Sequence, residues 1–173
     1  MMIIVDSGSS YKHGTYMSDK SDPTTIAALD AFCTKAETTT GRKIRWLRTD
    51  WVFDTISWGK YCQQHGIMHE FTVPYLSAQN GLSEQVIRTT IDDVCTLLRD
   101  SGLGHSYWAE AASYSISTRN LVPSRRHPDC IPLELFTGKR QNIAHLQVFG
   151  SRCWAKVPIA YGESKLDPQS TEC

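Results

Sequence analysis

Residues 43–74, KIRWLRTDWVFDTISWGKYCQQHGIMHEFTVP, decide the expected fold, because strand and helix patterns alternate within this one short stretch. The first segment, KIRWLRTD, is predicted to be a strand that finishes on Asp50. TISWGKYCQQHG has a helical pattern that Gly66 ends, and IMHEFTV is predicted to be a second strand that Pro74 ends. Strands that alternate with helices indicate an α/β layer architecture.

The flanking segments extend this alternation. Periodicity and turn residues predict a strand at 1–5 (MMIIV), a hairpin partner at 14–20, and helices at 24–41, 82–102 and 107–123. The predicted fold class is therefore α/β, with a mixed sheet flanked by helices. In the helix that begins at Leu82, one apolar face is predicted to pack on the core, and its members are Ile87, Ile91, Val94 and Leu98.

The composition is that of an ordinary globular chain with a real core. Of its 173 residues, 40% are hydrophobic and 21% are charged, and 18 cationic side chains balance 18 acidic ones. A net charge of zero argues against strong unaided binding to nucleic acid. No apolar run approaches the length of a membrane span. One run of cations could form a basic patch or a solvated surface, and it comprises Arg119, Arg125, Arg126, Lys139 and Arg140.

The six cysteines form no C-x-x-C pair, and no secretory leader is visible, which predicts free thiols in a reducing compartment. Cys33, Cys62 and Cys95 lie in helical patterns and are predicted to be small core residues. His65 and His69 have a zinc-like spacing without paired cysteines, so a zinc site is not expected.

Two carboxylates could share a site. Asp50 ends a strand, and Glu84 is predicted to lie in the first turn of a helix, after a loop at residues 74–85, PYLSAQNGLSEQ. Carboxylates that meet at a strand end and a helix start form the oxygen-rich pocket that Mg²⁺ or Mn²⁺ prefers. Two such ions can activate a water or a 3′-hydroxyl in a phosphoryl transfer. Turn and capping roles explain the same two residues without any catalysis.

Five longer segments carry a more specific pattern: GRKIRWLRTD, HGIMHEFTVPYLSAQNGLSEQ, YWAEAASYSISTRNLVPSRRHPDCIPLELFTGKR, HLQVFGSRCWAKVP and KLDPQSTEC. Together, and in this order along the whole chain, they resemble the integrase region of copia-type LTR retrotransposons. The QNG-x-x-E segment and the HL-x-VFG segment are specific in combination.

This resemblance implies an RNase H-like fold and a polynucleotidyl transferase that inserts element DNA into host DNA with an Asp, Asp, Glu triad and a divalent metal. Asp50 matches the second Asp and Glu84 matches the Glu, so both are expected to be catalytic and to bind Mg²⁺ or Mn²⁺. Gln79 and Asn80, with Arg88 beyond them, would contact DNA, although an Asn-Gly turn needs no further reason. The resemblance also implies DNA partners, self-association and a nuclear location.

The first Asp of the triad has no match in this chain. The segment VDSGSSY resembles part of the family's second strand, so Asp6 is expected to serve the SGSS turn. The family's first strand, with its Asp, is expected to be missing. Only 33 residues lie between Asp50 and Glu84, fewer than in the family pattern, and Gln85 stands where the family commonly has Arg. A triad that lacks one carboxylate should bind metal poorly and lose catalysis by orders of magnitude.

The expectation is therefore a truncated and catalytically defective integrase core at residues 1–142, followed at 143–173 by the start of an SH3-like module with a few strand pieces. Two alternatives stay open. One is an RNase H-like scaffold that binds DNA, RNA or another protein, and the other is an element remnant without molecular function. Binding to short duplexes with a steep salt dependence would favour the scaffold.

Overall fold

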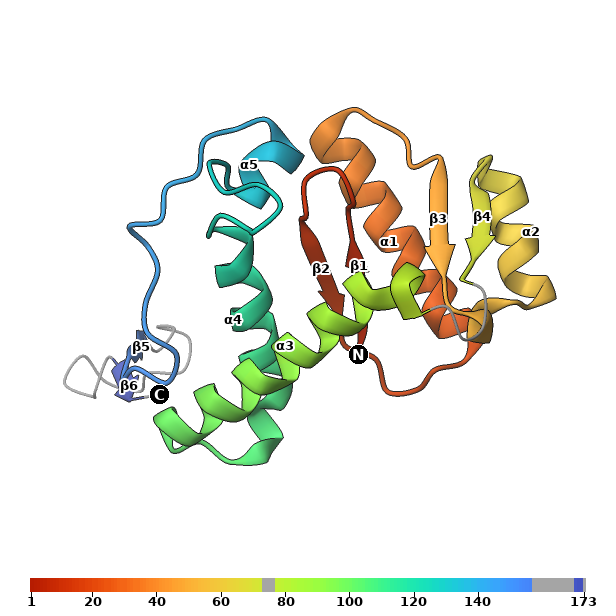
Figure 1. Ribbon diagram of the computed structural model, residues 1–173. Coiled ribbons are helices and arrows are strands. Elements are labelled where there is room, and N and C mark those ends of the chain that lie inside the picture. The colour runs from red at the N-terminus through yellow and green to blue at the C-terminus, as the bar shows by residue number, and fades with distance from the viewer. Residues whose placement is uncertain (73–76, 157–169, 173) are drawn as a thin grey trace.

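The computed structural model describes residues 1–72, 77–156 and 170–172, of which 77–80 and 171–172 by their backbone alone. Figure 1 shows helices on two sides of small sheets. The elements are β1 (Met2–Val5), β2 (Lys12–Thr15), α1 (Asp22–Thr40), β3 (Trp46–Thr49), α2 (Ile56–His65), β4 (Met68–Phe71), α3 (Ser77–Ser101), α4 (Trp108–Asn120), α5 (Pro132–Thr137), β5 (Trp154–Lys156) and β6 (Ser170–Glu172).

The strands form separate pairs, which corrects the prediction of one mixed sheet. β1 and β2 are antiparallel, with Ile4 opposite His13, and β3 and β4 are parallel, with Leu47 opposite His69. A tight turn joins the first pair, and the helix α2 makes the longer connection that a parallel pair requires. Within the described backbone no ladder joins β1 to β3, so the two pairs are not one sheet.

Helices cover both faces of the β1–β2 pair. The His13 ring stacks on Phe32 of α1 with 5.0 Å between ring centroids. The next residue, Gly14, faces α4, where a Cβ atom would lie 2.6 Å from Cδ1 of Ile116. Because successive strand residues point to opposite faces, α1 and α4 lie on opposite sides of this pair. Gly14 therefore leaves room for the Ile116 side chain of α4 against this face of the pair.

The core lies between α1, α2 and one face of the strands. Its main cluster comprises Leu29, Cys33, Trp58, Tyr61, Cys62 and Ile67. Ile4 of β1 and Leu47 of β3 both pack against this cluster, so the two strand pairs share one core although they share no ladder. Cys33 and Cys62 are buried as predicted, whereas Cys95 is exposed on α3.

Glycines end two of the helices where the sequence predicted. Gly41 closes α1 with a φ of 68°, and Gly66 closes α2 with a φ of 65°. Both values lie in the left-handed region that glycine adopts at low cost. At the start of α2, the Thr55 hydroxyl accepts a hydrogen bond from the Trp58 backbone N–H at 3.3 Å.

Helix α3 differs from its prediction in its start and in its buried face. It begins at Ser77, so residues expected to form a loop are helical and Glu84 lies about two turns inside the helix. Val86, Thr90 and Leu98 are the buried residues, whereas Ile87 and Ile91 are 42% and 50% exposed. The buried face is the i, i+4 row that begins at Val86, about 100° away from the predicted isoleucines. Thr90 can be buried because its hydroxyl donates to the Val86 carbonyl.

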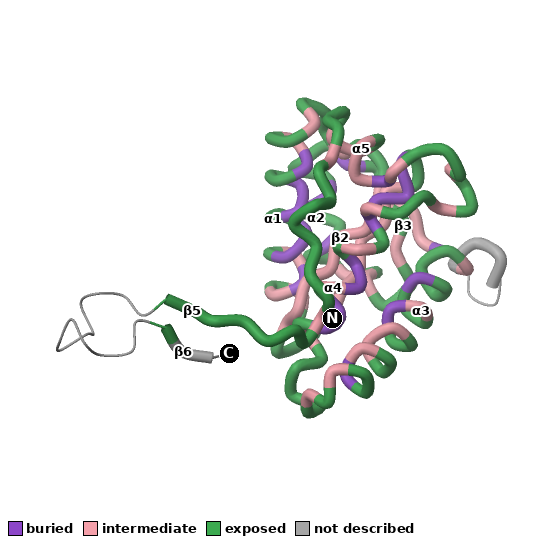
Figure 2. Tube along the Cα trace, turned by 90° about the vertical axis from the view of Figure 1, so that its left-hand side faces the viewer, coloured by how far each residue is buried: buried purple, intermediate pink, exposed green. Residues whose placement is uncertain are grey.

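The segment that contains HL-x-VFG packs against α4. The Tyr114 hydroxyl donates to the Gln147 carbonyl at 2.8 Å, and the Tyr114 and Phe149 rings are 5.5 Å apart. Gly150 has a φ of 77°, and a Cβ there would lie 2.3 Å from the Cβ of Ser101. The β5–β6 pair follows, and Figure 2 shows it standing apart from the helices with exposed residues along β5. No described helix is long and apolar enough to cross a membrane.

Asn120 at the end of α4 covers the outer edge of β2. Its Oδ1 accepts from the Lys12 backbone N–H at 2.9 Å, and its Nδ2 donates to the Lys12 carbonyl at 2.7 Å. The Asn120 side chain is buried, and it replaces the strand that Lys12 lacks on that side. This one amide therefore links α4 to the sheet across 108 positions of sequence.

We expect Asn120→Ala to lower the free energy of unfolding by about 1–3 kcal/mol, because it leaves two partly buried backbone groups of Lys12 without their side-chain partners. Asn142→Ala is the matched control, since Asn142 is exposed and only accepts from the nearby Ala144 N–H. The control should change stability by less than about 0.5 kcal/mol. Urea denaturation measures the free energy of unfolding of both variants. Equal stabilities of the two variants would show that the hydrogen bonds between Asn120 and the Lys12 backbone do not stabilise the fold.

Candidate functional site

Asp50 lies directly after β3, as predicted, and it is exposed. Its Oδ1 accepts a hydrogen bond from the Trp51 backbone N–H at 2.8 Å and so caps the short 3₁₀ turn Trp51–Phe53. The carboxylate is thus held at the end of the strand and remains open to solvent. Both the capping role and a ligand role fit this geometry.

Glu84 lies on the exposed face of α3. It lines an open hollow on the helix surface together with Ile87, Arg88, Ile91 and Asp92. Asp50 is not part of this lining. Among the described residues, no group of three or more His, Cys, Asp or Glu side chains is placed to hold a metal ion. The structure therefore presents two separate exposed carboxylates, and no complete metal site within the described part of the chain.

The predicted DNA-contacting residues all lie on α3. Gln79 and Asn80 belong to its first turn, so the expected Asn-Gly turn is replaced by helix, and their side chains lie outside the described residues. Arg88 is exposed in the same hollow as Glu84, one turn further along the helix. Glu84 and Arg88 therefore share one face of α3.

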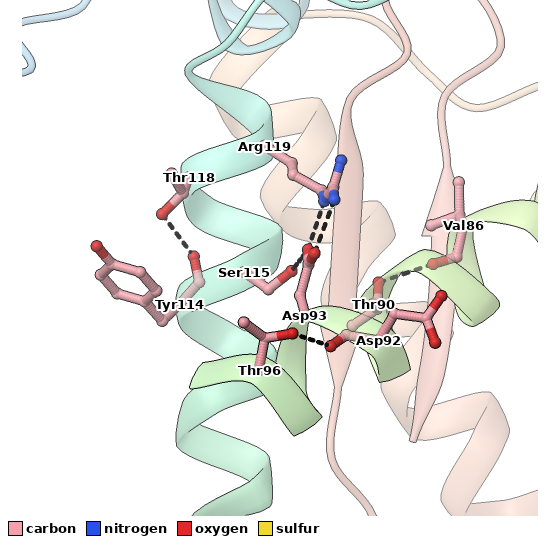
Figure 3. A network of polar contacts seen from close by, with 9 residues as sticks. All are labelled: Val86, Thr90, Asp92, Asp93, Thr96, Tyr114, Ser115, Thr118 and Arg119. Carbon is pink, nitrogen blue, oxygen red and sulfur yellow. Dashed lines mark hydrogen bonds and ion pairs between the residues drawn. The ribbon is translucent and has the colours of Figure 1, made fainter. Parts of the chain in front are cut away.

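A polar network fixes which face of α3 is exposed, and Figure 3 shows it. Arg119 of α4 donates to both carboxylate oxygens of Asp93, with 2.8 Å between Nη2 and Oδ1. The Ser115 hydroxyl donates to the same carboxylate at 2.5 Å. The hydrogen bond from Arg119 lowers the pKa of Asp93, against the opposing effect of burial, and Asp93 raises the pKa of Arg119 in turn. Sequence reasoning grouped Arg119 with a run of cations that could form a basic patch or a solvated surface, and it missed this pairing.

We expect Asp93→Asn to destabilise the protein by about 1–2 kcal/mol at pH 7, because charged hydrogen bonds are strong but Arg119 is partly exposed. The folded pKa of Asp93 is lowered, so its contribution is complete above the ordinary carboxyl pKa of roughly 4 and is lost as the pH falls through the lowered value.

Asp92→Asn serves as the matched control for that measurement, because Asp92 lies one residue away on the exposed face of α3. Its stability should follow the wild type within about 0.5 kcal/mol at every pH. Chemical denaturation at a series of pH values gives the comparison. A stability difference between Asp93→Asn and wild type that grows towards low pH would contradict the assigned ion pair.

Asp6 has the turn role that the sequence predicted. Its Oδ2 accepts from the Ser9 backbone N–H at 2.7 Å and from the Ser9 hydroxyl at 2.6 Å. Ser10, which follows, has a φ of 61°, so the turn holds a residue in the left-handed region. The Asp6 carboxylate is thus engaged in supporting the β1–β2 connection.

The two histidines with zinc-like spacing have separate neighbours. The His65 ring stacks on Tyr61 within α2, with centroids 4.3 Å apart. His69 lies on β4, where its Nε2 is 2.7 Å from the Thr49 hydroxyl. Burial lowers the pKa of His69, and Asp54 opposes the shift.

No family model matches this chain. The retrovirus-related Pol polyprotein from transposon TNT 1-94 of Nicotiana tabacum is 37% identical over 139 residues. The match covers 79% of this chain and 10% of that polyprotein, so the chain spans about a tenth of its curated relative. A chain in the cryo-EM structure of the simian T-cell lymphotropic virus intasome, solved in complex with PP2A regulatory subunit B56 gamma, superposes with a TM-score of 0.63. It covers 97% of this chain and 58% of that chain at 18% identity, which shows a shared fold alone.

Proposed function

We propose that this chain is the catalytic-core part of a retrotransposon integrase, with an RNase H-like arrangement in residues 1–142 and the start of an SH3-like module in 143–173. The similarity to a retrotransposon Pol polyprotein supports the integrase lineage, and the intasome chain supports the fold. The activity of the lineage is metal-dependent joining of DNA ends to target DNA. On this proposal the partners of the chain are element DNA, target DNA and further copies of the chain, and its subcellular location is the nucleus.

The observation that carries the proposal is the position of Asp50 and Glu84. Asp50 is exposed at the carboxyl end of β3, and Glu84 is exposed on α3 with Arg88 beside it. These are the strand-end and helix positions at which the resemblance puts the second Asp and the Glu. Arg88 could meet a phosphate next to Glu84, and Gln79 and Asn80 lie on the same helix.

The open strand edges support a proposed place for a third carboxylate. Asp6 N–H donates to the Tyr11 carbonyl, so by antiparallel alternation the backbone groups of Val5 point away from β2. The Thr72 N–H donates to the Thr49 carbonyl, so the backbone groups of Arg48 point away from β4. Both edges belong to strands that pack on the same core cluster.

A strand supplied from outside the described pairs could bind along both edges. Figure 1 shows that β1 and β3 run in opposite directions. An added strand would lie antiparallel to β1 and parallel to β3, which would bring its carboxyl end beside Asp50. An RNase H-like fold carries its first catalytic Asp on a strand of this kind. The proposal thus assigns the third carboxylate to such a strand.

Carboxylate oxygens are suitable ligands for Mg²⁺ or Mn²⁺, and Asp50 and Glu84 would provide them. Among the described residues, no group of three or more His, Cys, Asp or Glu side chains is placed to hold a metal ion, and the Asp6 carboxylate is engaged with Ser9. The ligand set is therefore incomplete, and no catalytic step can be assigned to a metal ion held by these residues alone. The proposal is that the isolated chain is catalytically defective.

A strand-transfer assay with a labelled element-end duplex and supercoiled target DNA tests the proposal. We expect the 173-residue chain to give no joining above background in Mg²⁺ or Mn²⁺. The same chain extended at its N-terminus by a strand-forming segment that ends in Asp should join DNA, because three carboxylates can then hold the ions. Asp50→Asn and Glu84→Gln in the extended protein should each abolish the joining.

Asp54→Asn is the control, since Asp54 follows the same 3₁₀ turn and has no role in the proposed site. Robust joining by the 173-residue chain that Asp50→Asn abolishes would show that the chain is not defective. Joining by the extended protein that survives both carboxylate substitutions would overturn the assigned roles.

A further inference from the structure

One face of the β3–β4 pair is exposed and carries aromatic and cationic side chains. Trp46 lies opposite Met68 in the parallel register, and the two side chains are 59% and 56% exposed. Leu47, between Trp46 and Arg48, points to the opposite side and packs on the core. Trp46 and Arg48 therefore share the outer face of the pair. Trp46 and Met68 thus form a small exposed apolar surface beside the cations that precede β3.

The segment that leads into Trp46 is strongly basic. Arg42, Lys43 and Arg45 are all exposed, and residues 41–48 contain four cations and no acid. Arg48 is paired with Glu70 at 3.0 Å, and neither described salt bridge involves the other three cations. This local excess stands out in a chain whose net charge is zero. A ligand that matches it carries several negative charges.

We propose that the outer face of β3–β4 at Trp46 and Met68, together with the exposed cations Arg42, Lys43 and Arg45 that precede β3, is a binding site for single-stranded nucleic acid. One unpaired base stacks on the Trp46 ring, with the Met68 side chain beside it, and the cations contact phosphates. Aromatic platforms combined with a positively charged track are the usual means of binding single strands.

The chemistry favours a single strand over a duplex. The bases of a duplex are stacked on each other, so they leave no free face for Trp46, whereas an unpaired base offers one. A duplex could use the cations alone, and its binding would then not depend on the indole ring. The loss of affinity on removal of Trp46 is thus the property that distinguishes the two.

This site does not include Asp50 or Glu84, but it lies on the strand that Asp50 directly follows. Asp50 follows Arg48 by two residues at the end of the same strand, so nucleic acid bound along the face would reach the Asp50 end of β3. Binding needs neither a metal ion nor a third carboxylate. The proposed binding can therefore be tested separately from DNA joining. The binding assays contain EDTA, which removes the divalent metal ions that joining requires.

The first test measures fluorescence anisotropy of a labelled 12-nucleotide oligo-dT, the matching oligo-rU and a 12-base-pair duplex with the full chain. We expect each single strand to bind at least tenfold tighter than the duplex. Trp46→Ala should weaken single-strand binding about tenfold, because stacking on one aromatic ring is lost. Trp46→Phe, which keeps an aromatic face, should retain most of the affinity, and comparison of the two oligonucleotides tells DNA from RNA.

Trp154→Ala is the matched control, because Trp154 is 64% exposed on β5, far from β3 in Figure 1. It should bind like the wild type, and far-UV circular dichroism checks that every variant is folded. Equal weakening by Trp46→Ala and Trp154→Ala, or an unchanged affinity of Trp46→Ala, would overturn the stacking assignment. Duplex binding as tight as single-strand binding would overturn the proposed ligand.

The cations are tested by the salt dependence of the same binding. Replacement of Lys43 and Arg45 by Gln should reduce the slope of log K against log salt by about 0.7 for each phosphate that is no longer neutralised. Lys60 and Arg99, both exposed on helices, give a control pair for which the slope should not change. An unchanged slope in the Lys43 and Arg45 variant would show that these cations do not bind phosphate.

Discussion

The packing of Trp58, a residue of α2, against α1 is the interaction on which the arrangement of both strand pairs depends. Its side chain is 2% exposed, and its Nε1 donates to the buried Thr25 hydroxyl at 3.2 Å. The cluster that surrounds it also receives Ile4 from β1 and Leu47 from β3. Since no backbone ladder joins those strands within the described chain, side-chain packing alone holds the two pairs together. Packing of this kind is less specific in register than a ladder, which leaves the strand edges between the pairs open.

The two candidate carboxylates belong to different parts of this arrangement. Asp50 follows β3, so its position depends on the Trp58 core. Glu84 lies on α3, which is oriented by the ion pair between Asp93 and Arg119 on α4. α4 is in turn linked to β2 by Asn120. The relative position of the two carboxylates therefore depends on contacts that run from the Trp58 core through the β1–β2 pair and α4 to α3. A strand that binds to both open edges would add a backbone ladder to these side-chain contacts.

Sequence reasoning predicted the elements well where a glycine, a proline or a capping residue marks an end. Gly41 and Gly66 end helices as expected, and the turn role of Asp6 is confirmed by its two hydrogen bonds to Ser9.

Sequence reasoning failed where the burial of a residue depends on partners that are distant in sequence. Leu98 of α3 is buried as predicted, whereas Ile87 and Ile91 are exposed and Val86 and Thr90 are buried in their place. The short helix α5 was missed, although Pro132 at its start and Gly138 at its end are typical helix signals. The exposure of Trp46 could not be predicted, because a strand with an alternating pattern does not reveal whether its outer face is covered.

Amide hydrogen exchange at the edges of β1 and β3 tests the central claim most directly, because that claim requires both edges to be unpaired in the isolated chain. The account predicts that the amides of Val5 and Arg48 exchange at least tenfold faster than those of Ile4 and Leu47, which point towards their paired strands. It also predicts that an added N-terminal strand ending in Asp protects Val5 and Arg48 together. Equal protection of all four amides in the isolated chain would show that the edges are already covered, and would contradict the proposed place for the third carboxylate.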